Sequence, residues 1–140
     1  MNAQETKGPG AEEAKNDVDV EELFDHEEWR NQAENPGVLE DIGRHLDESL
    51  SSNGQTLKAY IDDLKLAYEM LRSPSFTIEK GTKIVLIIAL LYLISPIDLI
   101  PDGIPFIGLF DDVLVAGYAM KKTAIELERY RSFKRSLSDV

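Results

Sequence analysis

The chain has no cysteine and only two histidines. The absence of cysteine excludes disulfides, thiolate-bound metals and cysteine nucleophiles. The first residues show no basic region followed by an apolar run, so we expect no cleaved secretion signal and a location on the cytoplasmic side. No segment alternates polar and apolar residues for long enough to predict a strand. The sequence therefore predicts an all-α fold.

Positive charge is also scarce, since 15 bases face 26 acids and give a formal net charge of −11. A field of that sign repels phosphate backbones, so we expect no nucleic acid partner. Residues 1–19 have almost no large apolar side chain, and we interpret them as a disordered acidic tail. Residues 20–140 then form a single helical domain, for which a hydrophobic content of 43% is enough to build a core.

Three helical segments are predicted before residue 80. A short amphipathic stretch around Phe24 and Trp29 ends before the helix breakers Pro36 and Gly37. Apolar residues every four positions predict a helix over 38–51. Spacings of four and three then form an apolar seam that ends before Pro74 and is suited to packing against another helix; it comprises Leu57, Ile61, Leu64, Tyr68 and Leu71.

The most apolar segment is Ile84 to Ile94, eleven uncharged residues in succession. A helix that is apolar on all sides is buried in protein or in lipid. Eleven residues span roughly 17 Å, which is short of the roughly 30 Å hydrocarbon layer of a bilayer. A further helix is predicted from Leu109 to Tyr130. The sequence thus predicts a small helical bundle built around an apolar helical hairpin at about 78–130.

The corner of this hairpin, SPIDLIPDGIPFIGLFDDV over 95–113, combines prolines with aspartates. Serine, proline and aspartate at its start are typical of a helix N-terminus, where they satisfy free backbone N–H groups. The Pro-Asp-Gly sequence indicates a turn, and the paired aspartates favour the first turn of the next helix. The residues of this structural motif are Ser95, Pro96, Asp98, Pro101, Asp102, Asp111 and Asp112.

The same carboxylates allow a second interpretation, in which they converge on a divalent cation. Mg²⁺ and Ca²⁺ select oxygen ligands, and the candidate ligands are Asp98, Asp102, Asp111 and Asp112. Their spacing differs from that of an EF-hand loop. No accompanying histidine, nucleophile or phosphate-binding loop is present, so catalysis by paired carboxylates is the lesser alternative and the sequence favours a non-enzymatic protein without a cofactor.

The stretch ALLYLISPIDLIPD over 89–102, followed by the pair Asp111 and Asp112, resembles the YkvA-like family of small helical domains of unknown function. The resemblance covers about residues 80–120. Gly103 departs from it, because the family usually carries a bulky apolar residue there. The resemblance implies a helical hairpin that is often regarded as membrane-associated, and it implies no reaction, substrate or cofactor.

Two functions of different classes follow. The first is a membrane-associated module whose apolar hairpin docks to a bilayer or to an integral membrane protein, with basic residues on both sides of the hairpin at the cytoplasmic face. The cost of placing four ionised aspartates at the bilayer centre, about 10–14 kcal/mol, disfavours two ordinary membrane-spanning helices. The second is a soluble adaptor that binds a partner protein through an exposed apolar groove. The sequence does not specify the oligomeric state.

Overall fold

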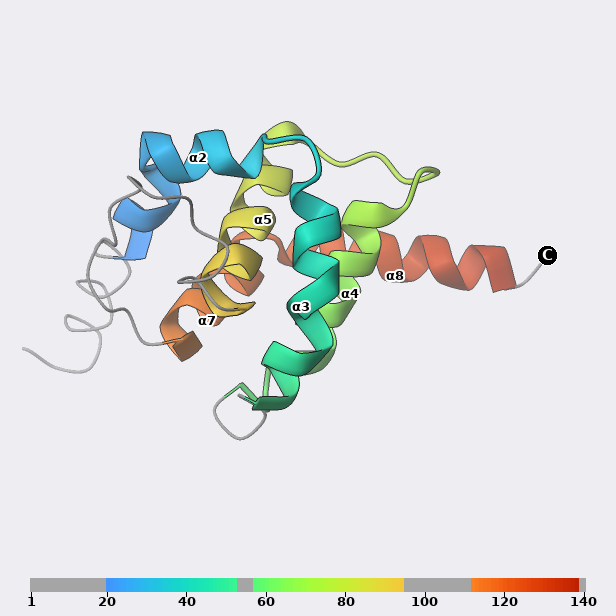
Figure 1. Cartoon of the computed structure of the whole chain (residues 1–140). Coiled ribbons are helices and arrows are strands. Elements are labelled where there is room, and N and C mark those ends of the chain that lie inside the picture. Colours follow the sequence, from blue (N-terminus) through green and yellow to red (C-terminus); the bar gives the residue numbers. More distant parts are fainter. Residues whose placement is uncertain (1–19, 53–56, 95–111, 139–140) are drawn as a thin grey trace, which may run out of the picture.

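The computed structural model of the protein describes residues 20–52, 57–94 and 112–138 (Figure 1). A first helical segment covers residues 20–25. It is followed by α2 (Glu27–Ala33), α3 (Val38–Ser52), α4 (Ile61–Arg72), α5 (Lys80–Ile94), α7 (Asp112–Lys122) and α8 (Ala124–Ser138). These described ranges contain no strand, which confirms the prediction of an all-α fold.

The helix boundaries before α5 follow the local sequence signals. Gly37 has a positive φ of 87°, a conformation that glycine adopts without steric cost, and it separates α2 from α3. α4 ends at Arg72, just before Ser73 and Pro74. Leu57 belongs to the predicted apolar seam but lies in the turn before α4, where it is fully buried. The helix predicted over 38–51 and the helix predicted in the following seam are therefore both present. The seam helix begins after Leu57, the first apolar residue of the seam.

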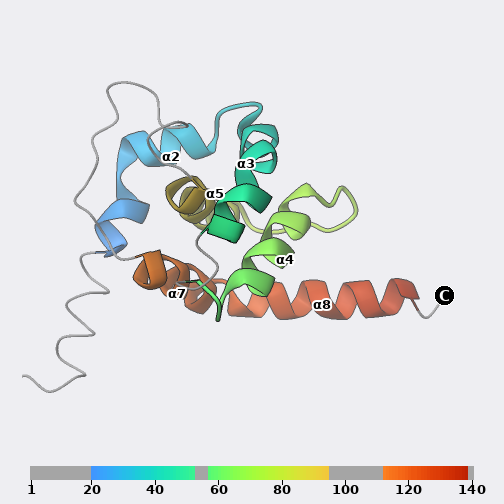
Figure 2. The same cartoon turned by 60° about the horizontal axis from the view of Figure 1, so that its bottom comes forward.

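The centre of the protein is α5, which other helices enclose (Figure 2). α2, α3, α4 and α7 all pack against it. Between Ile84 and Ile94 every side chain except that of Val85 is buried. The apolar run is thus covered by protein, and burial of each of its large side chains stabilises the fold by about 1.5–3 kcal/mol. α5 and α7 pack together as a hairpin would require, while the corner that joins them lies outside the described residues.

The segment 20–25 and α2 dock onto this core through aromatic side chains. The Phe24 ring stacks on the Tyr118 ring of α7 at a centroid distance of 4.9 Å. Trp29 of α2 is fully buried, and its ring lies 6.2 Å from that of Tyr92 on α5. Arg30 donates from Nη1 to the Phe24 carbonyl at 3.2 Å and ties the two helical segments together. The N-terminal helices are therefore part of the core.

α3 and α4 approach closely at Gly43. The Tyr68 hydroxyl of α4 donates to the Leu39 carbonyl of α3 at 3.0 Å. A Cβ atom at position 43 would overlap that hydroxyl oxygen, so the missing side chain of glycine leaves room for the tyrosine.

The C-terminal helical region differs from the prediction of one helix from Leu109 to Tyr130. Two helices, α7 and α8, meet at Thr123, and α8 continues to Ser138. Thr123 is buried, and its hydroxyl donates to the Ala119 carbonyl at 2.7 Å. Such a bond from a threonine side chain to the preceding turn bends helices, which explains the division. The end of α8 projects beyond the bundle (Figure 2).

Candidate functional site

The aspartate-rich corner lies almost wholly outside the described residues. This applies to Ser95, Pro96, Asp98, Pro101, Asp102 and Asp111. Asp112 is the first residue of α7 and is half-buried, where the prediction placed it in the first turn of a helix. Within residues 20–52, 57–94 and 112–138, no group of three or more histidine, aspartate and glutamate side chains could hold a metal ion. The cation site at the corner stays a prediction.

The described helices include none that is both long enough and apolar enough to cross a bilayer. α5 comes closest in composition, but its apolar residues already contact α2, α3, α4 and α7.

The clearest concave site lies where the turn between α2 and α3 meets the beginning of α5. The groove has a volume of about 600 Å³, and its walls come from residues 33–40, from the end of α4 and from the loop that leads into α5. A volume of this size is typical of pockets that bind small molecules or a few residues of a peptide. Gly37 holds the turn that forms one wall, so the breaker pair in the sequence has a direct role in shaping the groove.

The floor of the groove is apolar. Val38, Ile84 and Ile87 are buried beneath it, while Leu39 and Ile78 line it and are only partly buried. These two side chains therefore present apolar surface that a ligand could cover.

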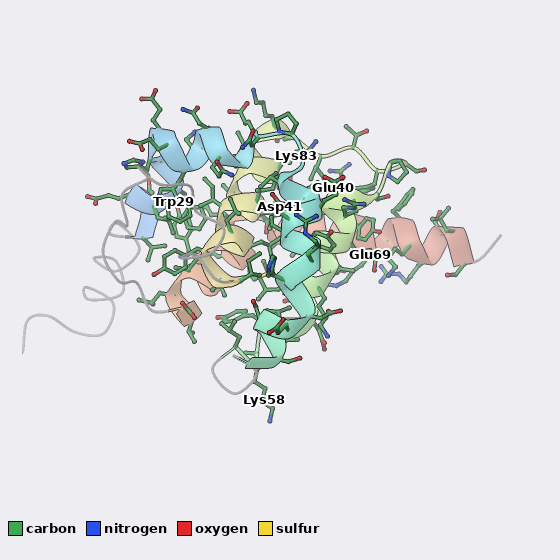
Figure 3. All side chains as sticks on the ribbon, in the orientation of Figure 1. Trp29, Glu40, Asp41, Lys58, Glu69 and Lys83 are labelled. Carbon is green, nitrogen blue, oxygen red and sulfur yellow. The ribbon has the colours of Figure 1, made fainter. Side chains whose placement is uncertain are left out.

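The rim of the groove is charged, and most of its charges are paired. The Lys80 ammonium lies 3.0 Å from Glu34, and the Arg72 guanidinium lies 3.5 Å from Glu40. Lys83 is exposed and forms no ion pair within the described part of the chain. Figure 3 shows Lys83 and Glu40 at the same end of the molecule, with Lys58 at the opposite end. The rim thus carries one cation in excess although the whole chain has a net charge of −11.

This arrangement is suited to binding a ligand. The groove offers an apolar floor and the Lys83 ammonium, which has no ion pair among the described residues, and its lining contains neither a histidine nor a hydroxyl side chain. An apolar group with a neighbouring carboxylate would match it, because the floor would cover the apolar part and Lys83 would attract the charge.

A second polar cluster joins α4 to α8. The Tyr130 hydroxyl donates to Glu69 at 2.7 Å, and the Lys134 ammonium lies 2.8 Å from the same carboxylate oxygen. The hydrogen bonds from Lys134 and Tyr130 lower the pKa of Glu69 below its usual value. Burial, followed by the hydrogen bond to Glu69, raises the pKa of Tyr130 from 10.0 to about 12. The cluster is a structural clamp, since each of its groups has a partner within the fold.

Because of this clamp, we expect the free energy of unfolding to fall as the pH rises into the alkaline range. Because the pKa of Tyr130 is higher in the folded state, its stabilising contribution is complete below pH 10.0 and is lost as the pH rises toward about 12. Tyr130→Phe should lower the free energy of unfolding by about 1–2 kcal/mol at neutral pH. It should also reduce the decline in stability between these two pH values.

Urea unfolding followed by circular dichroism on both sides of pH 10.0 measures this effect. Tyr60→Phe, which removes the hydroxyl group of a tyrosine outside the clamp, is the control. If the free energy of unfolding fell equally with rising pH in the Tyr130→Phe variant and in the wild type, Tyr130 would not be the group responsible.

The groove was not predicted from the sequence. Two local signals mark its parts, namely the Pro36–Gly37 break and the lysines that precede the apolar run of α5. Neither signal indicates that these segments meet, because that depends on how α2, α3 and α5 pack.

Residues 82–118 match the model of a family described as a protein of unknown function, DUF1232. The match includes most of α5 and the first part of α7, and it supports a relation to an uncharacterised family of small domains over that segment. It does not confirm the narrower resemblance to the YkvA-like family. Searches of curated proteins and of solved structures found no match.

Proposed function

We propose that the protein is a non-enzymatic helical module that binds an acidic and apolar segment of a partner protein in the groove beside Lys83. The observation that carries this proposal is the Lys83 ammonium, without an ion pair in the described ranges of the chain, next to partly exposed apolar side chains in a concave site of about 600 Å³. A peptide segment fits the dimensions, and its apolar side chains would cover Leu39 and Ile78.

Charge complementarity favours an acidic partner. The excess cation at the groove attracts carboxylates, whereas the net charge of the remaining surface repels them. Binding should therefore be confined to the groove, and it should weaken when the charge at position 83 is changed from positive to negative.

Selection from a random peptide library tests the proposal. We expect the enriched peptides to combine aspartate or glutamate with large apolar residues, and Lys83→Glu to weaken their binding at least tenfold, which corresponds to about 1.4 kcal/mol. Lys58→Glu makes the same charge change at an exposed position far from the groove and should leave binding unchanged (Figure 3).

Amide chemical shifts locate the bound peptide. Saturable shifts at Leu39, Ile78 and Lys83 support the groove. Failure to enrich any peptide, or equal binding by the Lys83→Glu and Lys58→Glu variants, would contradict the proposal.

The second candidate is association with an anionic membrane surface, for which the end of α8 is the relevant feature. Leu137 is 58% exposed and, like Arg135, lies on the projecting part of the helix. This candidate ranks second because Arg131 and Lys134, two other bases of that region, are already paired with Asp63 and Glu69 of α4. Flotation with anionic but not with neutral vesicles would support it, and absence of flotation with both would oppose it.

A further inference from the structure

The loop of residues 73–79, which we call the strap, leaves the end of α4 and leads into α5 (Figure 1). No backbone N–H of residues 77–79 donates to a backbone carbonyl within the described part of the chain. Phe76 and Ile78 are half-buried, whereas their immediate neighbours in the chain are exposed. This alternation is typical of an extended segment with one side against the protein. The position of the strap therefore depends mainly on the side chains of Phe76 and Ile78.

Phe76 packs against α8. Its ring meets the Tyr130 ring edge to face at a centroid distance of 5.1 Å, and the Phe133 ring lies at 5.2 Å. The Arg129 guanidinium lies 5.1 Å from the centre of the same ring, within the range of a cation–π contact. α8 is in turn tied to α4 by the clamp at Glu69. The middle of the strap is thus anchored to a helix that the fold itself holds in place.

Ile78, two residues further along the strap, forms part of the wall of the groove. It lines the groove together with Leu39 of α3, and both side chains are only partly buried. Two residues of extended chain span about 7 Å, so the anchor and the wall belong to one short piece of backbone. Phe76 is outside the groove lining that the described residues form. Any effect of Phe76 on a ligand in the groove must therefore pass through the strap.

The ends of the strap are restrained by weaker contacts than its middle. Arg72, just before it, pairs with Glu40 at 3.5 Å, and Lys80, just after it, pairs with Glu34 at 3.0 Å. The four side chains are between 44% and 75% exposed, and exposed ion pairs restrain a chain only slightly. The aromatic contacts of Phe76 are therefore the main restraint on the strap.

We propose that α8 controls the groove by holding the strap through Phe76, which keeps Ile78 in the groove wall. This regulation rests on the proposed binding of a peptide in the groove. Phe76 is then a positioning residue, because it acts on the ligand through Ile78. A ligand that requires the wall binds only while Ile78 is in place, so release of the strap lowers the apparent affinity in proportion to the time that Ile78 spends elsewhere.

Nuclear magnetic resonance of the full chain without a ligand provides the first test. In Phe76→Ala the backbone order parameters of residues 77–79 should fall below about 0.6, and the Ile78 methyl signals should move toward their positions in an unfolded chain. Phe133→Ala removes a partner of Phe76 on α8 and should cause a smaller change in the same direction. Leu137→Ala, which truncates an exposed apolar side chain of α8, should change neither.

A double-mutant cycle provides the second test, with the tightest-binding peptide of the library selection as the probe. Phe76→Ala should weaken binding about fivefold or more, as expected if Ile78 is in place for about a fifth of the time or less. Ile78→Ala should weaken binding by at least as much. In a chain that already carries Ile78→Ala, Phe76→Ala should change the affinity by less than about twofold, because the side chain through which it acts is absent.

Three results would overturn the proposal. They are residues 77–79 that stay as ordered in Phe76→Ala as in the wild type, peptide binding that Phe76→Ala does not weaken, and a Phe76→Ala effect that persists in full beside Ile78→Ala. Circular dichroism shows whether the variants fold. If Phe76→Ala does not fold, Phe133→Ala makes the same tests from α8.

Failure of this proposal and failure of peptide binding give different results. If peptides bind in a manner that depends on Lys83 but not on Phe76, the groove keeps its function and α8 does not control it. If no peptide is selected, the function fails, and the order of residues 77–79 in Phe76→Ala still decides whether α8 holds the strap.

Discussion

Trp29→Ala should lower the free energy of unfolding by about 3–5 kcal/mol, since it removes a large, fully buried side chain from the contact between α2 and α5. Urea unfolding followed by far-ultraviolet circular dichroism measures the loss. Trp29 is also the only tryptophan of the chain, so the wild type should show the short-wavelength emission of a buried indole.

Glu28→Ala is the matched control, because it truncates the exposed neighbour of Trp29 on the same helix. It should change stability by less than about 0.5 kcal/mol. A Trp29→Ala variant as stable as Glu28→Ala would mean that α2 does not dock on α5, and the wall of the groove that begins at Ala33 would lose its support.

Leu90→Ala should destabilise the protein by about 2–5 kcal/mol, because it leaves a cavity at the centre of α5 where protein surrounds the side chain. The measurement is again urea unfolding in the absence of detergent and lipid. The comparison is Leu137→Ala, which removes the same atoms from a side chain that is 58% exposed and should cost little in folding.

The result also distinguishes an apolar run that is buried in protein from one that is buried in lipid. If Leu90 faced lipid in the functional state and was loosely packed without it, its truncation would cost about as little as that of Leu137. A large difference between the two variants requires α5 to be enclosed by the other helices.

The helices were predicted most accurately where a spacing pattern and a breaker coincide. α3 and α4 lie where repeated apolar residues end at glycine or proline. α5 was placed correctly as a helix apolar on all sides, but the sequence could not distinguish protein from lipid around it, because both environments favour the same residues. The contacts with α2, α3, α4 and α7 identify the protein environment.

The remaining features depend on individual side-chain hydrogen bonds or fall on residues outside the described part of the chain. The division at Thr123 follows from a side-chain bond to Ala119 that an apolar pattern does not reveal. The Nδ1 of His26 accepts from the Glu28 backbone N–H at the start of α2, a cap that the apolar spacing does not reveal. The predicted roles of Asp98 and Asp102 lie outside the described residues and stay predictions.

The enclosure of α5 has a consequence for how the chain is made. Three of the helices that cover it, α2, α3 and α4, precede it in the sequence, but α7 follows it. During synthesis from the N-terminus, the apolar run of α5 therefore leaves the ribosome before its last cover exists. During that interval it exposes a hydrophobic surface of the type that chaperones bind. The order of the helices thus makes the nascent chain vulnerable to aggregation at a stage that the finished fold conceals.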